Sequence, residues 1–231
     1  PMYRAVEVKA GDTLVCSTAK QGKYAYLAVA GGIDVPVVMG SRATNLKCAI
    51  GGYQGRKLAF GDELPLSVTG VFLDNHYRKH LEPPVFSNEI TLRVVPGPQD
   101  ELFTDRGKQT FLSGTYTLQP DSDRMGIRLS GPEIESIAGV DIISDAIAFG
   151  SIQIPSSGQP IILMADRQTT GGYAKIGTVI SPDLPKLAQC TAGAKIHFQW
   201  VTAAEANRLY RQHQKQLRRL ARKTGLCLKK W

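Results

Sequence analysis

The sequence has few of the short motifs that identify an enzyme class. Its 231 residues contain no GxxxxGK[ST] phosphate-binding loop, no GxGxxG dinucleotide motif, no GxSxG nucleophile motif and no HExxH zinc motif. We therefore expect no ATP binding through a P-loop. The same absences argue against an α/β-hydrolase and against a zinc peptidase.

Cysteine is also scarce, and its spacing excludes the usual zinc clusters. The four cysteines are Cys16, Cys48, Cys190 and Cys227. No two of them form a CxxC pair. His76 and His80 stand four residues apart, a ligand spacing on a helix, but the proline pair that follows disfavours a helix there. We expect no metal site.

Long apolar runs are missing as well. No stretch approaches the roughly 18 uninterrupted apolar residues of a membrane span, and no signal peptide is recognisable. The unpaired cysteines are typical of free thiols in a reducing compartment. We therefore expect a cytoplasmic protein that does not interact with membranes.

The positive charge is confined to one end of the chain. The formal net charge is +8, yet Lys and Arg balance Asp and Glu over residues 1–201, so the excess lies in residues 202–231. A nucleic-acid-binding protein usually presents a basic surface on its folded body. We expect no nucleic acid as a partner.

What the sequence does contain is short apolar runs separated by turns. Strand-length runs rich in β-branched or aromatic residues occupy residues 24–30, 90–95, 160–164 and 194–201. Gly-Gly and Gly-Asp pairs recur between such runs. This pattern favours a mostly β protein, a sandwich or barrel, over alternating strands and helices.

Composition also suggests domain boundaries. Residues 76–88 are polar, basic and interrupted by a proline pair, as expected of an exposed linker. We place one β unit at residues 1–75 and a second at residues 89–201. Residues 202–231 predict a basic amphipathic helix, opened by a capping box of Thr202 and Glu205.

The densest set of reactive side chains follows the apolar run at residues 160–164. Residues 165–175 read ADRQTTGGYAK. Paired glycines let backbone amides approach a ligand closely. Arg167 and Lys175 could hold a carboxylate or phosphate, and Asp166 could exchange a proton. The alternative is a polar hairpin whose Thr and Asp side chains satisfy turn amides.

Smaller polar clusters lie outside this segment. Asp123 and Arg124 precede a predicted strand, where they could simply pair with each other at the surface. Asp145 sits in an apolar stretch, so it needs a partner and is either functional or a turn cap. Gln159 lies in a segment that, taken alone, is better interpreted as a simple turn, and the alternative for Arg42 is a solvated side chain in an Asx- or Ser-type turn.

Residues 158–179 (GQPIILMADRQTTGGYAKIGTV) resemble the signature of the allophanate hydrolase subunit 2 family, which includes the C subunit of 5-oxoprolinase and is also called biotin-dependent carboxyltransferase-like. Further matches are YLAVAGGIDV at residues 26–35, GSR at 40–42, RVVPGPQD at 93–100, DRMG at 123–126 and ISD at 143–145. The resemblance implies two cyclophilin-like β-barrel subdomains and partner subunits A and B. Family members usually have a further N-terminal part with a TTVQDxGR-like motif, so we expect the first subdomain to be incomplete.

The resemblance also implies an activity. It favours a subunit, inactive alone, of a complex that hydrolyses 5-oxo-L-proline, a small cyclic amide, to L-glutamate at the expense of ATP. Asp166 and Lys175 would then be catalytic. Substrate would be bound by Arg167, Gln168, Thr169, Thr170, Gly171, Gly172, Tyr173, Gln159, Arg42, Asp123, Arg124 and Asp145.

Two other activities stay open. One is biotin-dependent carboxyl transfer, as in urea amidolyase, in which the same loop would hold biotin and an amide. This chain has no MKM-type biotinylation motif, so the biotin would come from another protein. The other is a non-enzymatic antagonist of a histidine-kinase inhibitor, which needs only a binding surface.

Overall fold

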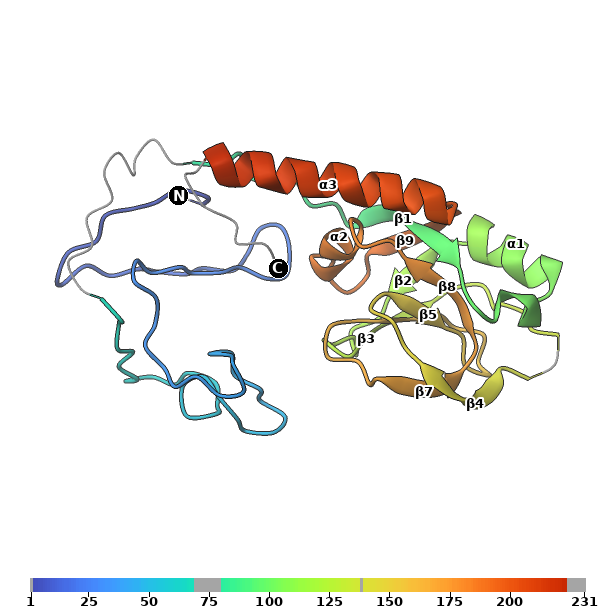
Figure 1. Cartoon of the computed structure of the whole chain (residues 1–231), viewed down its shortest axis with the longest axis horizontal. Coiled ribbons are helices and arrows are strands. Elements are labelled where there is room, and N and C mark those ends of the chain that lie inside the picture. The colour runs from blue at the N-terminus through green and yellow to red at the C-terminus, as the bar shows by residue number, and fades with distance from the viewer. Residues whose placement is uncertain (1, 69–79, 138, 224–231) are drawn as a thin grey trace. The chain divides into compact units, whose positions relative to one another are not determined.

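A computed structural model describes residues 2–68, 80–137 and 139–223 (Figure 1). The chain divides into two compact units. One unit comprises Pro1–Tyr24 and Lys79–Trp231, and the other comprises Ala25–Arg78. All the named helices and strands of the described residues belong to the first unit.

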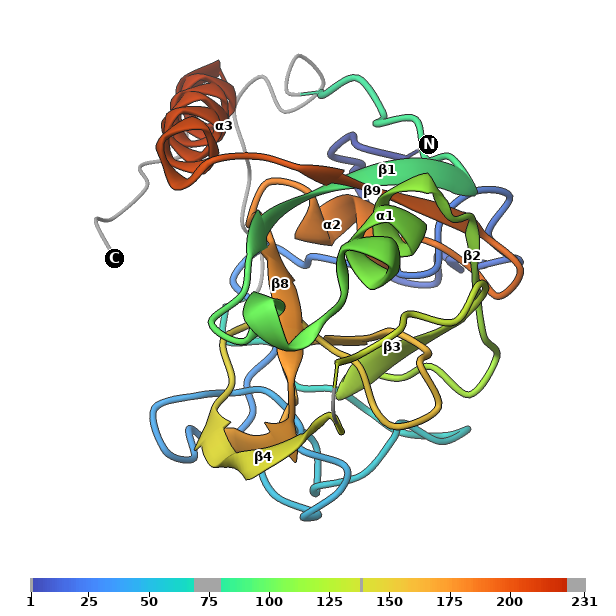
Figure 2. The same ribbon diagram turned by 90° about the vertical axis from the view of Figure 1, so that its right-hand side faces the viewer.

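The first unit is built on a closed β-barrel (Figure 2). Its elements are β1 (Glu89–Pro96), η2 (Asp100–Leu102), α1 (Asp105–Ser113), β2 (Tyr116–Leu118), β3 (Gly126–Ser130), β4 (Asp141–Ala146), β5 (Ser151–Gln153), β6 (Ile161–Leu163), β7 (Thr170–Tyr173), β8 (Lys175–Val179), α2 (Leu184–Ala188), β9 (Lys195–Trp200) and α3 (Ala203–Lys223). The barrel order is β1-β8-β5-β6-β3-β2-β9, and β4 and β7 form a separate two-stranded sheet. Strands β1 and β9 close the barrel in parallel.

This architecture confirms the predicted fold class: mostly β, with a barrel and a C-terminal helix. Three of the apolar runs chosen from the sequence form strands of the barrel, namely β1, β6 and β9. Their inward residues make the core, in which Phe111 of α1 stacks on Phe198 of β9 at 4.2 Å between ring centroids. The first subdomain and the domain boundaries stay predictions.

The strand predicted at residues 24–30 is wrong. The backbone of Tyr24 is instead bound by the side-chain amide of Gln189, at 3.0 Å and 3.1 Å. A strand is stable only when its backbone groups pair with a neighbouring strand. The described residues of the second unit supply only isolated bridges, such as Ile33 with Leu66, so Tyr26 and Leu27 remain exposed.

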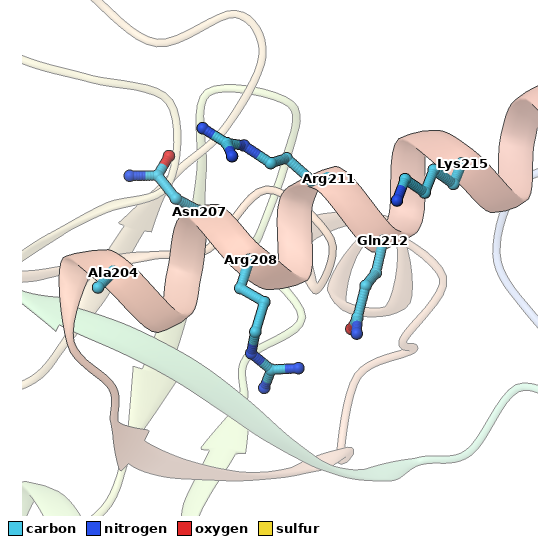
Figure 3. A pocket seen from close by; sticks show the side chains of 6 residues that line it. All are labelled: Ala204, Asn207, Arg208, Arg211, Gln212 and Lys215. Atoms are coloured by element: carbon cyan, nitrogen blue, oxygen red, sulfur yellow. The ribbon is translucent and has the colours of Figure 1, made fainter.

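Helix α3 follows β9 after two residues. The Val201 amide donates to the Val94 carbonyl at 2.9 Å, and the Thr202 hydroxyl accepts from the Glu205 amide at 3.1 Å. This confirms the Thr202 half of the predicted capping box. The Glu205 carboxylate faces Arg208 at 3.5 Å, so it forms a pair along the helix (Figure 3 shows Arg208). Among the described residues, no helix combines the length and apolarity needed to cross a bilayer.

A buried carboxylate joins α2 to the barrel. Asp183, which directly precedes α2, is fully buried. It accepts from Arg93 Nη2 at 2.6 Å, from Arg93 Nε at 2.8 Å and from the Arg93 amide at 3.0 Å. Lys186 Nζ adds a contact of 2.9 Å. A carboxylate can be buried at this depth because several donors replace its hydration.

We expect Asp183→Ala to destabilise the fold by about 3–5 kcal/mol, because it leaves the partly buried guanidinium of Arg93 without its partner. Urea denaturation would measure the loss. The matched control is Asp121→Ala, which removes an exposed carboxylate 3.3 Å from Arg128 and should cost less than about 1 kcal/mol. Equal effects of the two substitutions would contradict the assignment.

The same contacts predict a dependence of stability on pH. Burial raises the pKa of Asp183, but hydrogen bonds from Arg93 and Lys186 outweigh it and hold the pKa below its ordinary value. A carboxyl with a lowered pKa in the folded state stabilises the protein above its unfolded pKa of about 3.9. That contribution is lost as the pH falls through the folded value.

We therefore expect the urea midpoint of the wild-type protein to fall with pH from about 5 downward. Asp183→Asn, which cannot ionise, should start lower at neutral pH and show a shallower fall. Parallel curves for the two proteins would show that Asp183 does not contribute to the acid sensitivity.

Candidate functional site

The segment singled out in the sequence forms the connection from β6 through β7 to β8. Its first acid, Asp166, meets Arg124 from the turn before β3. Arg124 Nε and Nη2 lie 2.8 Å and 2.9 Å from the two carboxylate oxygens, and the Asp166 amide donates to the Arg124 carbonyl at 2.8 Å. Both side chains are more than half exposed. The two turns are thus joined at the surface by a two-pronged ion pair.

The pairing restricts what Asp166 can do. The hydrogen bonds from Arg124 hold the pKa of Asp166 below its ordinary value, although partial burial opposes them. The carboxylate is therefore ionised at neutral pH and is a poor proton donor. It suits a role as a fixed negative charge or a hydrogen-bond acceptor.

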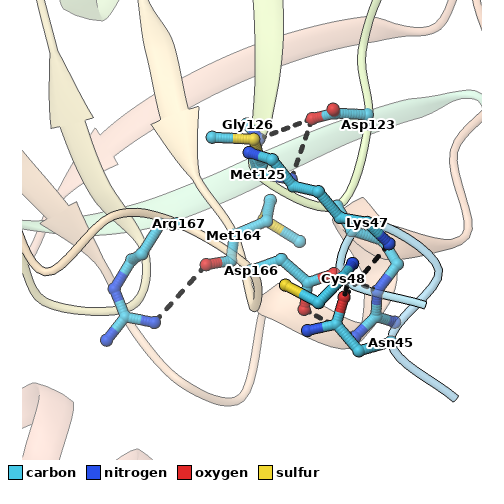
Figure 4. Close-up of polar contacts among 10 residues, drawn as sticks. Asn45, Lys47, Cys48, Asp123, Met125, Gly126, Met164, Asp166 and Arg167 are labelled. Carbon is cyan, nitrogen blue, oxygen red and sulfur yellow. Dashed lines mark hydrogen bonds and ion pairs between the residues drawn. The ribbon is translucent and has the colours of Figure 1, made fainter. Parts of the chain in front are cut away.

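Arg167, the next residue, donates its hydrogen bonds to backbone carbonyls. Its Nε donates to the Ile147 carbonyl at 3.1 Å and its Nη1 to the Met164 carbonyl at 3.4 Å, the latter visible in Figure 4. Its guanidinium carbon lies 5.6 Å from the Phe149 ring centroid, a cation–π distance. Arg167 therefore fixes the shape of the loop that carries Asp166.

Lys175, the first residue of β8, forms the second pair. Its side chain is 3% exposed, and its Nζ lies 2.7 Å from Asp145 Oδ2 and 3.1 Å from the Ala146 carbonyl. The Asp145 carboxylate, on β4, is 48% exposed. The pair therefore runs from the protein interior to its surface, with the amine inside and the carboxylate outside. This is the partner that the position of Asp145 in the sequence required.

A third residue, Gln99, connects the two members of this pair. Its Oε1 accepts from the Lys175 amide at 3.3 Å, and its Nε2 donates to Asp145 Oδ2 at 3.3 Å. Gln99 can approach because Gly97 lies against the Lys175 carbonyl, where a Cβ atom would collide with backbone. Sequence reasoning did not select Gln99 as a site residue, although it stands in the quoted RVVPGPQD match.

These contacts set the charge of Asp145. The hydrogen bond from Lys175 lowers the pKa of Asp145 most, and those from the Ala146 amide and the Gln99 side chain lower it further. Asp145 is thus held as an ionised, solvent-accessible acceptor.

The glycines of the segment lie beside Asp145. Strand β7 pairs with β4, with Gly171 opposite Asp145 and Thr170 opposite Ala146. A Cβ at Gly171 would lie 2.7 Å from Ile147 Cδ1 and 2.9 Å from the amide of the buried Gln153. A side chain at position 171 would displace the ends of the Ile147 and Gln153 side chains, so packing favours glycine in this part of the motif.

The remaining residues of the segment flank these glycines. A Cβ at Gly172 would come within 3.3 Å of the Ile142 carbonyl. Gln168 and Thr169 are exposed, and the Thr169 carbonyl accepts from the Ile147 amide at 2.9 Å. Tyr173 is 42% exposed at the end of β7. The segment therefore presents polar side chains around a backbone that packing holds in place.

Other residues selected from the sequence make local structural contacts. Asp123 Oδ1 accepts from the Met125 and Gly126 amides at 2.8 Å and 3.1 Å (Figure 4), which stabilises the turn before β3. Gln159 binds both backbone groups of Gly131, at 2.8 Å and 3.2 Å. Their substrate-binding roles stay predictions.

Arg42 belongs to the second unit. Its Nη1 lies 3.4 Å from Asp34 Oδ1, and both side chains are about half exposed. The part of the chain that the structure describes contains no group of three or more His, Cys, Asp or Glu side chains suited to a metal ion.

We expect Lys175→Met to raise the pKa of Asp145, because the substitution removes the strongest hydrogen bond to its carboxylate. A ¹³C NMR titration of the Asp145 carboxyl group would measure the shift. Lys195→Met is the control, since that exposed lysine donates to Thr117 at 2.9 Å and not to Asp145. An Asp145 titration that is the same in all three proteins would show that Lys175 does not control it.

Comparisons with known proteins agree with this architecture. Residues 1–200 match the family model described as carboxyltransferase domain, subdomain A and B. The C subunit of the Haemophilus influenzae 5-oxoprolinase is 40% identical over 212 residues, covering 92% of this chain and 67% of that protein. The protein of the same name in Escherichia coli is 38% identical over 214 residues, covering 93% and 68%.

A solved structure extends the comparison to three dimensions. The Kluyveromyces lactis urea carboxylase superposes with a TM-score of 0.74 and 25% sequence identity over 88% of this chain. The match spans 20% of that much longer protein. Together with the family match over residues 1–200, the barrel and its β6–β8 segment place the chain in the carboxyltransferase domain, subdomain A and B, family.

Proposed function

We propose that this chain is a subunit of an ATP-dependent complex that hydrolyses 5-oxo-L-proline to L-glutamate in the cytoplasm. The observation that carries the proposal is the 40% identity, over 92% of the chain, to a protein named as the C subunit of 5-oxoprolinase. In this proposal the chain works with subunits A and B and is inactive alone.

The geometry suits a cyclic amide. The lactam of 5-oxoproline presents one N–H donor, one carbonyl acceptor and a nearby carboxylate. Asp145 is ionised, partly exposed and oriented by Lys175 and Gln99, so it can accept a hydrogen bond from the lactam N–H. The exposed Thr169 and Thr170 beside it can bind the carbonyl or carboxylate of the substrate.

An unstrained lactam reacts slowly with water, and ATP phosphorylation of its oxygen makes the ring carbon more electrophilic. Water then adds to that carbon, the ring C–N bond breaks and the nitrogen takes a proton, which leaves glutamate with the phosphoryl group on its side-chain carboxyl. A second water hydrolyses this acyl phosphate to L-glutamate and phosphate. ATP would be bound elsewhere in the complex, because the sequence has no P-loop. Arg124, whose side chain is more than half exposed, is a cation of the site that can balance the charge of a phosphorylated intermediate.

A second candidate is biotin-dependent carboxyl transfer to an amide. It is favoured by the superposition on urea carboxylase over 88% of the chain. Urea offers the same amide donors and acceptors as the lactam, so Asp145 could orient either substrate. The biotin would arrive on a separate carrier protein.

The deciding experiment mixes this chain with subunits A and B and measures ATP hydrolysis and glutamate formation on addition of 5-oxo-L-proline. Glutamate that forms only when this chain is present would support the proposal. If no glutamate forms but carboxybiotin loses its carboxyl group to urea in the presence of this chain, the second candidate replaces the first.

We expect Asp166→Ala to lower turnover of the complex by about 10²–10³-fold, the usual effect of removing one charged or hydrogen-bonding group from a reacting centre. The fold should be unaffected, because the Arg124–Asp166 pair is exposed and such pairs stabilise by at most about 1 kcal/mol. Asp121→Ala, which removes a comparably exposed ion pair with Arg128, is the control and should keep full turnover. Full turnover of Asp166→Ala would remove this residue from the mechanism.

A further inference from the structure

The hydrogen bonds of the Asp145 carboxylate define what it can still bind. Oδ2 accepts from Lys175 Nζ at 2.7 Å and from Gln99 Nε2 at 3.3 Å, whereas Oδ1 accepts from the Ala146 amide at 2.7 Å. An ionised carboxylate offers about four acceptor positions, two on each oxygen. The donors among the described residues therefore use both positions on Oδ2 and one on Oδ1. Because the side chain is half-exposed, Oδ1 can accept one further hydrogen bond from a ligand.

The orientation of the Gln99 side-chain amide follows from its second hydrogen bond. The backbone amide of Lys175 can only donate, and it donates to Gln99 Oε1 at 3.3 Å. The Nε2 group is then left to face Asp145, where a donor meets an ionised acceptor. The network thus assigns the oxygen and the nitrogen of the amide without ambiguity. A glutamine matches both the donor on one side and the acceptor on the other.

The backbone that carries Gln99 is held against β8. The Gly97 amide donates to the Ile176 carbonyl at 2.9 Å, and a Cβ at Gly97 would collide with the Lys175 carbonyl. The Gln99 carbonyl accepts from the Leu102 amide at 3.1 Å, at the end of η2. The side chain of Gln99 therefore starts from a fixed position between β1 and η2 and reaches the β4–β7 sheet.

Gln99 and Lys175 act on Asp145 in different ways. A lysine ammonium is a point charge that can donate in several directions, so it keeps the carboxylate ionised without fixing its plane. The planar amide of Gln99, bound at both ends, restricts the direction in which the carboxylate faces. Its two bonds are longer than the common 2.9–3.0 Å, so we expect a modest energetic effect from each.

We propose that Gln99 is a positioning residue that acts through Asp145. It holds the carboxylate so that Oδ1 faces the ligand and accepts a hydrogen bond from an N–H group. The proposal deepens the proposed function and rests on it only for the identity of the ligand, whose N–H group is that of the lactam. The site then selects its ligand by an N–H donor.

Two substitutions separate positioning from packing. Gln99→Met keeps a side chain of similar length that makes neither hydrogen bond. Gln99→Glu keeps an acceptor for the Lys175 amide and replaces the donor by a carboxyl group. When protonated, this introduced carboxyl can donate to Asp145 as the amide does, and when ionised it repels Asp145. The proximity of two carboxyl groups raises the pKa of the pair.

The first measurement is a ¹³C NMR titration of the Asp145 carboxyl group in the full chain. The hydrogen bond from Gln99 lowers the pKa of Asp145, and the charged group that faces this carboxylate, Lys175, is kept in every variant. We expect the apparent pKa of Asp145 to be lowest in the wild type, higher in Gln99→Met and highest in Gln99→Glu.

Gln119→Met is the matched control for this titration. Gln119 is also half-buried and links β2 to β3, where its Nε2 donates to the Thr117 carbonyl at 3.0 Å and to Ser130 Oγ at 2.6 Å. It makes no hydrogen bond to Asp145 among the contacts of the described chain, so its loss should leave the Asp145 titration unchanged. The same Asp145 titration in all four proteins would overturn the proposal.

The second measurement is glutamate formation by the chain together with subunits A and B. Relative to the wild type, we expect Gln99→Met to lower kcat/KM about threefold to tenfold, both at about pH 6 and at about pH 8. Gln99→Glu should be impaired more at about pH 8 than at about pH 6, where the introduced carboxyl regains its proton. An equal deficit of Gln99→Glu at the two pH values would show that Gln99 acts by packing alone.

Failure of this proposal is distinguishable from failure of the proposed function. If the wild-type chain forms no glutamate with its subunits, the oxoprolinase activity is removed, while the expected order of Asp145 titrations would still support the positioning role of Gln99. Glutamate formation combined with an Asp145 titration that does not respond to substitutions at position 99 would do the reverse.

Discussion

The parallel pairing of β1 with β9 is the constraint on which the rest of the described architecture depends. Six consecutive residue pairs, from Glu89 with Lys195 to Val94 with Trp200, close the barrel between strands far apart in the sequence. Strand β1 also carries Arg93 to the buried Asp183 and leads directly to Gln99. Strand β9 leads directly to α3. The candidate site and helix α3 are therefore both extensions of one strand pair.

At the candidate site the two members of the Lys175–Asp145 ion pair differ in burial. The amine of Lys175 is enclosed, where it cannot meet a ligand without rearrangement, whereas the carboxylate of Asp145 reaches solvent. The buried cation thus acts through the exposed anion, which it holds ionised and oriented. Gln99 fixes the distance between them from a third segment of the chain. A small polar ligand would meet a preorganised acceptor.

The sequence predicted much of the fold and part of the site. Apolar runs and turn residues report local preferences, and they located β1, β6 and β9 and the start of α3. They failed for residues 24–30, because an apolar run does not say whether a partner strand is available. The need of Asp145 for a partner is visible in the sequence, but spacing along the chain could not identify Lys175, thirty residues away. Gln99 was missed because a glutamine near a turn carries no signal until the fold places it between two other residues.

The short link between β9 and α3 has a thermodynamic consequence. The Val201 amide, at the start of this link, is still bonded to β1, so the helix has little slack relative to the strand pair that closes the barrel. A ligand that binds only the folded form of a protein raises its stability in proportion to the logarithm of ligand concentration. A molecule that binds α3 only in the folded protein will therefore also stabilise the pairing of β1 with β9 that closes the barrel. Binding at α3 and closure of the barrel are therefore linked equilibria, so the free energy of unfolding would rise as a ligand occupies α3.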